Sequence, residues 1–303
     1  MVIAPKIQLN NGIHMPVIGL GTLFSQSREI EEAVKNAIDC GYRHIDTAFC
    51  YGNEKDVGRA IKAKIEEGVI RREDIFVVTK LWSTHHEPSA VVPACQQSLQ
   101  NLGLSYVDLY LMHFPVGFSQ YGGINDIDYV HTWKAMEPLI DKGLARSIGL
   151  SNFNSEQIER VLQVCKVKPV VNQVECNIGF NQKKLIEFCK QRDIQITAYC
   201  PLGQPNPCKK DPPFLFDDRI KAMGAKYNKS AAQVALRYLI QIGTIPIPKS
   251  VTKHRIAENI NIFDFELSGD DMRVLETYHT GKRKILFHFA DSKHKYYPFN
   301  IEF

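Results

Sequence analysis

The chain repeats one local pattern about eight times: a short apolar run of strand length, then a segment with apolar residues at helical spacing. In the first unit, residues 17–20 form the run, and Ile30, Val34, Ala37 and Ile38 are spaced as on one face of a helix. The runs are continuous rather than alternating, as expected for strands buried on both faces of a parallel sheet. Strands and helices that alternate without a break in composition predict an α/β fold, a (β/α)8 TIM barrel.

The boundaries of the expected elements follow from the same pattern. After 17–20, the strands are 43–45, 75–79, 106–112, 145–150, 170–174, 195–199 and 245–247. The helices are 28–40, 53–67, 91–102, 129–142, a segment after Asn154, 182–191, 231–241 and 254–260, and a Pro-rich, irregular insertion spans 201–216. Ahead of the barrel, Asn10-Asn11-Gly12 predicts a hairpin turn between strands 6–9 and 13–15.

A doubly wound sheet is the alternative fold. Its dinucleotide fingerprint needs Gly-x-Gly-x-x-Gly, but Gly19 and Gly21 are followed by Phe24 where the third glycine would stand. The barrel is therefore preferred, with residues 1–303 as one domain. The tail 281–303 does not continue the pattern and is rich in aromatic residues, so we expect it to pack across a barrel mouth.

The composition is that of an ordinary globular chain, with 44% hydrophobic and 23% charged residues. A net charge of +4 without a long Lys/Arg block gives no sign of nucleic-acid binding, and no apolar run reaches membrane-spanning length. The eight cysteines form no Cys-x-x-Cys and no paired metal-ligand spacing, which favours free thiols and no metal site. With no signal-peptide pattern, the expected location is the cytoplasm.

Polar and ionisable side chains recur where the expected strands end. Asp46 and Tyr51 follow the second strand, Lys80 ends the third, and His113 ends the fourth. Later strand ends carry Ser151, Asn152, Gln173, Tyr199, Lys249 and Ser250. Because the carboxyl ends of barrel strands meet at one mouth, where barrel enzymes hold their active sites, we expect these side chains to share one pocket.

The first four of these residues are suited to proton donation. A phenol has an ordinary pKa of about 10, so Tyr51 donates a proton well only if a cation such as Lys80 stabilises its anion. Asp46 would hold the ammonium, and His113 would hydrogen-bond a substrate oxygen that gains negative charge, such as a carbonyl receiving hydride. Two interpretations of Lys80 stay open beside this one: a structural ion pair with Asp46, and the Schiff-base lysine of a barrel aldolase.

The chain resembles the aldo-keto reductases from end to end. The matching motifs are Gly-Leu-Gly-Thr at 19–22, Gly-Tyr-Arg-His-Ile-Asp-Thr-Ala at 41–48, Tyr-Gly-Asn-Glu at 51–54, Lys-Leu-Trp at 80–82, His-Phe-Pro at 113–115, Gly-Leu-Ser-Asn-Phe at 149–153, Asn-Gln-Val-Glu at 172–175, and Ile-Pro-Lys-Ser-Val-Thr at 247–252. That family is a (β/α)8 barrel closed at the bottom by an N-terminal hairpin, and it reduces aldehydes and ketones with NADPH. The resemblance implies NADPH/NADP as cofactor, a small carbonyl compound as substrate, and a monomer.

The resemblance also implies residue roles. Tyr51 would be the general acid, Asp46 and Lys80 would tune it, and His113 would be the orienting donor. The implied cofactor-binding residues are Gly21, Thr22, Asp46, Ser151, Asn152, Gln173, Tyr199, Cys200, Leu202, Lys249, Ser250, Val251, Thr252, Arg255, Glu258 and Asn259.

Each part of the cofactor has its own group of these residues. The nicotinamide carboxamide would bind Ser151, Asn152 and Gln173, and its ring would stack on Tyr199. The adenine would lie at Glu258 and Asn259, and the adenosine 2′-phosphate would lie on Lys249, Ser250, Thr252 and Arg255. Physical chemistry agrees with the phosphate assignment, because cations and hydroxyl groups beside a helix start form an anion site.

The departures from the family pattern concern the substrate and the pyrophosphate. Phe114 stands where many members have Trp, Leu23 replaces a common aromatic residue, and Cys200 replaces a serine. The implied substrate pocket is Leu23, Cys50, Tyr51, Trp82, His113, Phe114, Phe118, Leu286 and Phe287. Its apolar wall and the short loop 115–129, similar to that of insect members acting on ecdysteroid ketones, predict apolar aldehydes and bulky, steroid-like ketones ahead of sugars.

Two further functions from other classes are compatible with these motifs. One is an NADPH-binding regulatory module with little turnover, as among channel-associated relatives. The other is a structural protein, as in the lens crystallins recruited from the family.

Overall fold

A barrel of parallel strands forms the centre of the molecule. The computed structural model describes residues 3–23, 27–119, 123–286, 292–301 and 303. Its eight-stranded sheet runs in the order β3-β4-β5-β6-β9-β10-β11-β12, with neighbouring strands parallel. The strands are β3 (Leu20–Gly21), β4 (His44–Asp46), β5 (Phe76–Leu81), β6 (Leu109–Met112), β9 (Ile148–Ser151), β10 (Val171–Glu175), β11 (Gln195–Tyr199) and β12 (Thr244–Pro246). The predicted (β/α)8 fold is confirmed.

The two edges of the sheet meet through glycines. Gly19 N–H donates to the Pro246 carbonyl and Gly21 N–H to the Pro248 carbonyl, each at 3.1 Å. A Cβ on Gly21 would lie 2.7 Å from the carbonyl oxygen of Ile247. A side chain would therefore push the first strand away from the last, and glycine is needed at this closure.

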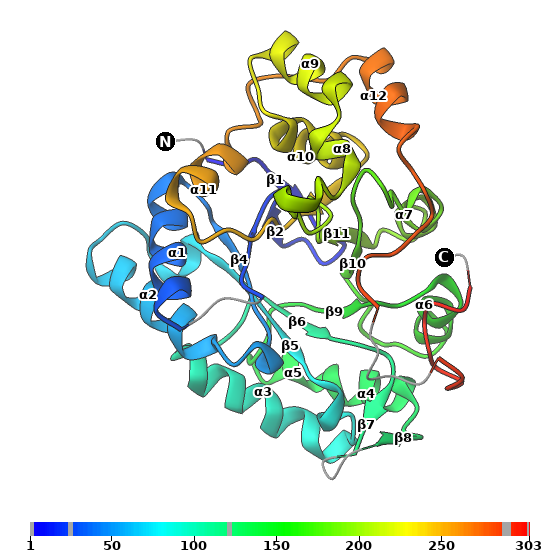
Figure 1. Cartoon of the computed structure of the whole chain (residues 1–303). Coiled ribbons are helices and arrows are strands. Elements are labelled where there is room, and N and C mark those ends of the chain that lie inside the picture. The colour runs from blue at the N-terminus through cyan, green and yellow to red at the C-terminus, as the bar shows by residue number, and fades with distance from the viewer. Residues whose placement is uncertain (1–2, 24–26, 120–122, 287–291, 302) are drawn as a thin grey trace.

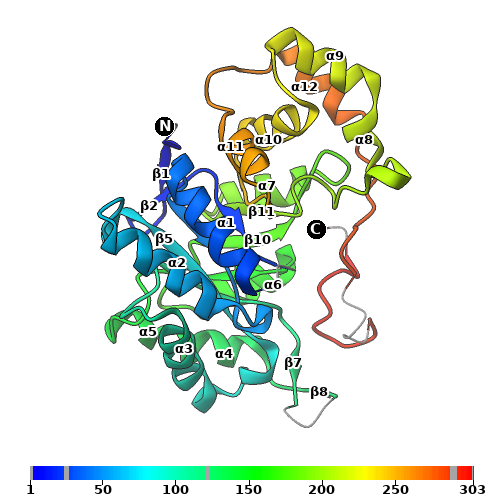
Figure 2. The same ribbon diagram turned by 60° about the vertical axis from the view of Figure 1, so that its left-hand side comes forward.

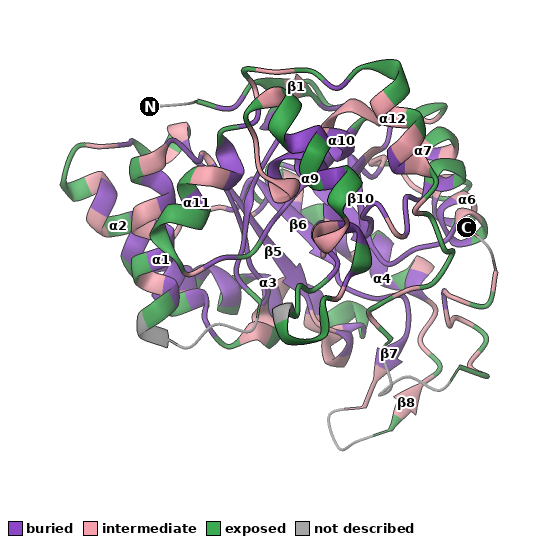
Figure 3. Cartoon of the chain, turned by 45° about the horizontal axis from the view of Figure 1, so that its top comes forward, coloured by how far each residue is buried: buried purple, intermediate pink, exposed green. Residues whose placement is uncertain are grey.

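Helices surround the strands (Figure 1). They are α1 (Ser27–Cys40), α2 (Glu54–Glu66), α3 (Pro88–Leu102), α4 (Tyr129–Met136), α5 (Pro138–Asp141), α6 (Ser155–Leu162), α7 (Lys183–Lys190), α8 (Pro213–Phe216), α9 (Asp218–Tyr227), α10 (Ala231–Gln241), α11 (Lys253–Ile260) and α12 (Gly269–Glu276). Figure 3 shows buried strands at the centre and exposed residues on the outer sides of the helices. Of the helices in the described residues, none is both long and apolar enough to span a bilayer.

The N-terminal hairpin closes one end of the barrel. Strands β1 (Lys6–Gln8) and β2 (His14–Pro16) pair antiparallel, and Gly12 takes the positive φ of 85° in the turn between them. Leu9 and Met15 are buried in one apolar cluster with inward-facing residues of the strands. The hairpin therefore fills the bottom of the barrel and leaves its other end for the site.

Alternation along each strand decides which side chains enter the barrel. On β5, Phe76 and Val78 join the cluster inside the barrel, whereas Val77 and Leu81 pack against the helices. Because successive strand side chains point to opposite faces, Lys80 shares the inward face with Phe76 and Val78. The same alternation directs inward Asp46, His113, Ser151, Gln173, Glu175 and Tyr199.

Several elements were not predicted. Helices α9 and α12 lie outside the eightfold repeat, and they share an apolar cluster with α8 and with α10 of the repeat at one side of the barrel (Figure 2). A small hairpin of β7 (Gly117–Phe118) and β8 (Ile124–Asn125) occupies the segment predicted as a plain loop. The predicted helix 129–142 is divided into α4 and α5 because Pro138 has no N–H to continue the helical ladder.

The C-terminal segment lies beside the barrel mouth. Asn154 Nδ2 donates to the Pro298 carbonyl at 3.0 Å, and Gln157 Nε2 donates to the Tyr296 carbonyl at 2.9 Å. These bonds hold the tail against α6, where it is visible in red in Figure 1. The eight cysteines all carry free thiols, as predicted.

Candidate functional site

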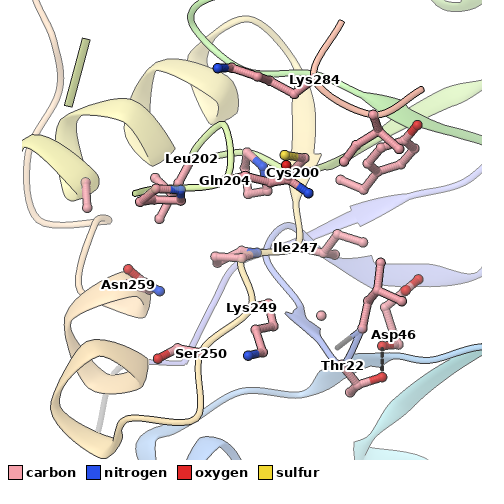
Figure 4. Close-up of a pocket in the computed structure, with 18 of the residues that line it drawn as sticks. Thr22, Asp46, Cys200, Leu202, Gln204, Ile247, Lys249, Ser250, Asn259 and Lys284 are labelled. Atoms are coloured by element: carbon pink, nitrogen blue, oxygen red, sulfur yellow. Dashed lines mark hydrogen bonds between the residues drawn. The ribbon is translucent and has the colours of Figure 1, made fainter. Parts of the chain in front are cut away.

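A cavity of about 1100 Å³ opens at the carboxyl ends of the strands. One end is bordered by Tyr51, Trp82 and His113, and the other by α11 with Arg255 and Asn259. Between these ends, Figure 4 shows residues of several strand-to-helix loops facing the same space. The predicted gathering of strand-end residues at one mouth is therefore what the barrel produces.

Tyr51 lies in a tight turn after β4. The short 3-10 helix Phe49–Tyr51 ends at Gly52, whose φ of 68° is readily adopted by glycine. Asn53 then fixes the loop: its Oδ1 accepts from Thr47 Oγ1 at 2.8 Å, and its Nδ2 donates to the Thr22 carbonyl at 2.9 Å. This framework holds the phenol at the cavity wall.

Lys80 lies directly behind the phenol and is fully buried. Its Nζ is 2.5 Å from Asp46 Oδ1, 2.8 Å from the Thr47 carbonyl and 3.4 Å from the Tyr51 hydroxyl. The ammonium is therefore paired with a carboxylate on one side and touches the phenol on the other. Lys80 is not among the residues that line the cavity, so its nitrogen does not face a carbonyl bound there, which disfavours the Schiff-base interpretation.

Burial decides the protonation of the two groups that face the cavity. Desolvation raises the pKa of Tyr51 well above its ordinary value of 10.0, and the negative charge of Asp46 adds to the effect. Desolvation lowers the pKa of His113 well below 6.5, and the positive charge of Lys80 adds to that shift. Around neutral pH the phenol therefore keeps its proton and the imidazole is neutral.

His113 is oriented by contacts around its ring. Its backbone N–H donates to the Leu81 carbonyl at 3.1 Å, which extends the β5–β6 ladder beyond the end of β6. The ring meets Trp82 edge-on at 5.2 Å between centroids, and Cys50 Sγ lies 3.5 Å from its Nδ1. Burial raises the pKa of the Cys50 thiol to about 12, so this thiol carries its hydrogen at neutral pH. A thiol hydrogen donated to Nδ1 leaves Nε2 as the protonated nitrogen.

A chain of polar contacts joins the tetrad to the middle of the cavity. Gln173 Nε2 donates to Asp46 Oδ2 at 2.7 Å, and Ser151 Oγ donates to the Gln173 carbonyl at 2.9 Å. Asn152, with a positive φ of 65°, donates through Nδ2 to the His113 carbonyl at 2.9 Å. The hydroxyl of Tyr199 donates to Asn152 Oδ1 at 2.7 Å. These side-chain amides and hydroxyls are the groups that a planar carboxamide can hydrogen-bond.

The far end of the cavity has the character of an anion site. Lys249 and Arg255 both border it and are exposed. Among the described residues, neither side chain makes a hydrogen bond or an ion pair. Thr252 is the N-cap residue of α11 and its side chain makes no capping hydrogen bond, so the first N–H groups of that helix are also available. Figure 4 shows Lys249 and Ser250 across the cavity from Gln204 and Lys284.

These features fit a phosphorylated dinucleotide. The cavity offers amides and a phenol ring at one end and, at the other, two cations that have no carboxylate partner in the described part of the chain. Cys200 borders the middle with a positive φ of 52°, and burial raises the pKa of its thiol to about 12. It therefore offers a weak S–H donor where a serine would offer a stronger hydroxyl.

Most of the predicted site residues line this one cavity. They are Gly21, Thr22, Leu23, Asp46, Cys50, Tyr51, Trp82, His113, Ser151, Asn152, Gln173, Tyr199, Cys200, Leu202, Lys249, Ser250, Val251, Thr252, Arg255, Glu258, Asn259 and Leu286. Lys80 stands behind the wall, as a residue that acts through Tyr51 would.

Three residues predicted to line the substrate pocket are not among its lining residues. Phe114 is 1% exposed and packs edge-on against Tyr297 and Phe299, so it supports the tail rather than the pocket surface. Its side chain follows the outward alternation of β6, opposite to that of His113. Phe118 is not among the lining residues and contacts the ring of Trp82 at 6.0 Å. Phe287 lies outside the described residues.

Other lining residues were not predicted. They come from the insertion and α8, the start of α10, the loop after β12 and the tail: Pro201, Gln204, Pro205, Leu215, Phe216, Ser230, Ala231, Ala232, Ile247, Pro248, Lys284 and Ile285. Ile247 and Pro248 belong to the motif at 247–252, and no motif marks the others. The signal for the others is position, because the insertion follows a barrel strand at the same mouth and the tail was expected to cross it.

Comparison with known proteins agrees with this geometry. The model of the Aldo/keto reductase family matches residues 17–278. Aldo-keto reductase family 1 member A1-A of Danio rerio is 45% identical over 316 residues, covering 97% of this chain and 98% of the relative.

Two solved structures from the silkworm, Bombyx mori, are also similar. Aldo-keto reductase AKR2E5 aligns with a TM-score of 0.95 at 41% identity, covering 99% of this chain and 95% of the other. AKR2E4, solved in complex with NADP, aligns with a TM-score of 0.89 at 41% identity, covering 98% and 100%. The resemblance seen in the motifs is confirmed, and the chain belongs to the aldo/keto reductase family.

Proposed function

We propose that the protein is an NADPH-dependent reductase that converts aldehydes and ketones to alcohols. The observation that carries the proposal is the buried Lys80 ammonium, which joins the Asp46 carboxylate to the Tyr51 hydroxyl at the cavity wall. A protonated phenol backed by a fixed cation is an acid prepared for one event, the appearance of negative charge on an oxygen in front of it.

The side chains have distinct tasks in this reaction. When bound, NADPH would supply a hydride to the carbonyl carbon. Tyr51 gives its proton to the carbonyl oxygen as that oxygen gains charge, and Lys80 stabilises the phenolate that is left. Asp46 keeps the ammonium in place, and neutral His113 hydrogen-bonds the same oxygen and orients the substrate.

The cofactor would lie along the cavity with its two ends recognised differently. Ser151, Asn152 and Gln173 are proposed to hold the nicotinamide carboxamide, with Tyr199 beneath the ring. The cations beside α11 are proposed to hold the 2′-phosphate, which NADH lacks. What supports this assignment is that Lys249 and Arg255 border the cavity and have no carboxylate partner among the described residues, so both cations are available to a phosphate group.

The substrate preference follows from the wall near the phenol. Leu23, Cys50, Trp82 and Leu286 border the cavity there, and Leu23 and Leu286 are exposed apolar side chains. We propose that apolar aldehydes and bulky, steroid-like ketones are preferred over sugars, whose hydroxyl groups would lose water without finding partners on such a wall. In this proposal the tail 281–303 belongs to the same domain as the barrel and forms part of the substrate site.

The test compares wild type with Tyr51→Phe on 4-nitrobenzaldehyde, a short enal, glyceraldehyde and a keto-steroid, following the loss of reduced-nicotinamide absorbance. We expect turnover in wild type, its loss in the variant, and unchanged NADPH affinity by calorimetry. Tight NADPH binding without any turnover in wild type would instead indicate a binding module or structural protein. Efficient turnover of glyceraldehyde with poor turnover of the aromatic aldehyde would contradict the substrate preference.

A further inference from the structure

A buried carboxylate outside the catalytic tetrad holds the tail at the mouth of the barrel. Glu175 is the last residue of β10 and is 0% exposed. Its Oε1 accepts the backbone N–H of Lys284 at 2.8 Å, and its Oε2 accepts that of Ile285 at 2.9 Å. The two oxygens therefore bind consecutive backbone groups of one segment, more than a hundred residues away in the sequence, and Oε1 also accepts from Asn177 Nδ2 at 3.4 Å.

The segment bound by Glu175 forms part of the cavity wall. Lys284, Ile285 and Leu286 all line the cavity, and Leu286 is 51% exposed. We propose that Glu175 is a positioning residue that fixes this wall and thereby determines how well large substrates are held. The proposal rests on the proposed reductase function and deepens it, because it names what sets the substrate class at that site.

The other described attachments of this segment are weaker or lie further from the wall. Lys284 Nζ forms an ion pair with Asp211 of the insertion at 2.6 Å, but both side chains are more than a third exposed, and exposed pairs contribute little. Thr280 N–H donates to the Gly179 carbonyl at 2.9 Å, four residues before Lys284. The Arg283 guanidinium lies over two rings, that of Phe299 in the tail and that of Phe180 in the loop after β10, and it forms no described hydrogen bond with the barrel. The charge-assisted hydrogen bonds that the buried carboxylate accepts are therefore the firmest link between barrel and wall.

The geometry separates large substrates from small ones. Tyr51, Lys80 and His113 are held by β4, β5 and β6 and make no described contact with Glu175. A short aldehyde at the Tyr51 hydroxyl would need only that end of the site, whereas a bulky ketone would also reach Ile285 and Leu286. Loss of the hydrogen bonds to Glu175 should therefore weaken the binding of the bulky substrate and leave the proton and hydride transfer unchanged.

The experiment measures kcat and KM of Glu175→Ala and Glu175→Gln with propanal and with a keto-steroid, using NADPH. Glu266→Ala is the matched control, since this glutamate is exposed. We expect the KM for the keto-steroid to rise about tenfold in Glu175→Ala, the scale of one or two lost hydrogen bonds, with little change for propanal. Glu175→Gln keeps one carbonyl acceptor and should lie between. Equal losses for both substrates would mean a structural role only, and unchanged kinetics would also overturn the proposal.

A second pair of variants tests the same bonds from the tail, in case Glu175→Ala does not fold. Lys284→Pro deletes one N–H donor together with the exposed ion pair, whereas Lys284→Met deletes only the ion pair. We expect the shift in KM with Lys284→Pro alone. Identical behaviour of the two variants would assign the effect to the Asp211 pair instead.

Hydrogen exchange separates this proposal from the proposed function. The N–H groups of Lys284 and Ile285 should be protected in wild type and lose protection in Glu175→Gln and, more strongly, in Glu175→Ala, whether or not any carbonyl compound is reduced. If the wild type reduced neither substrate, the reductase function would be refuted, but the proposal that Glu175 fixes the tail segment would not. If the two N–H groups exchanged rapidly in an active wild type, only the role of Glu175 would be refuted.

Discussion

Replacing Lys80 with methionine should destabilise the protein strongly, because it removes one partner of a buried ion pair. Lys80 is 0% and Asp46 1% exposed, and their charged atoms are 2.5 Å apart. Methionine keeps most of the apolar stem and leaves Asp46 as a buried carboxylate without its cation. Breaking such a pair from one side costs about 3–5 kcal/mol of unfolding free energy.

The remaining contacts refine this magnitude. Asp46 would keep the hydrogen bond from Gln173 Nε2 at 2.7 Å, so we expect a loss near the lower end, about 3 kcal/mol. In Asp46→Asn, Lys80 would keep the Thr47 carbonyl and the Tyr51 hydroxyl, and a similar loss is expected. The double variant buries neither charge. It should be more stable than the sum of the two losses predicts, by at least about 2 kcal/mol.

The measurement is the urea midpoint of unfolding, with the turnover of 4-nitrobenzaldehyde followed in parallel. With a slope of roughly 3 kcal/mol per molar, Lys80→Met should unfold at about 1 M less urea than wild type. Lys62→Met is the control, because Lys62 lies in an exposed ion pair with Glu66, and it should behave like wild type. Turnover should be lost in the double variant as well, since stability without the cation does not restore the acid.

Three results would each refute part of this reasoning. An unchanged urea midpoint for Lys80→Met would mean that Asp46 does not need its cation in the folded protein. Additive losses in the double variant would mean that the two charges do not stabilise each other. Full turnover in a folded Lys80→Met variant would remove Lys80 from the proposed mechanism.

Three further predictions concern the proposed reaction. The rate of reduction at saturating NADPH should not change between pH 6.5 and 10.0. Burial lowers the pKa of His113 and raises that of Tyr51, so His113 stays neutral and Tyr51 stays protonated over this range. A rate that changes near pH 6.5 would contradict this. Arg255→Ala should weaken NADPH binding by about tenfold in calorimetry and leave NADH unchanged, whereas equal losses would remove it from the phosphate site. Cys50→Val should lower kcat by freeing Nδ1 of His113 while Cys50→Ser retains it; equal kcat in both would show that the thiol does not orient the ring.

The barrel could be predicted from the sequence because each strand and helix of the repeat leaves a pattern in its own stretch of residues. A strand that is apolar on both faces must be buried on both, as in a parallel sheet covered by helices. The segments with helical spacing are those covering helices. Three helices were missed: α8 lies within the insertion predicted to be irregular, and α9 and α12 lie outside the repeat. Their caps at Asp217 and Ser268 were visible in the sequence, but nothing local indicated that they would pack together.

Strand alternation explains both the success and the error at His113 and Phe114. The two residues are adjacent in sequence, and the family motif implied that both face the substrate. Alternation from Leu109 and Leu111 directs His113 inward and Phe114 outward, so Phe114 packs under the tail. The period of two was readable from the sequence; that Tyr297 and Phe299 would cover the outer face was not.

By itself, the sequence determined which chemical groups stand at the ends of the strands, because strand period and residue type are properties of neighbouring residues. Only the tertiary structure decided their distances. Lys80 and Asp46 are 34 residues apart, Gln173 and Asp46 are 127 apart, and Glu175 and Lys284 are 109 apart. Closing the barrel brings these pairs within hydrogen-bonding distance and removes water from around them. Burial then keeps Tyr51 protonated and His113 neutral, since desolvation depends on the whole fold and not on any local stretch of chain.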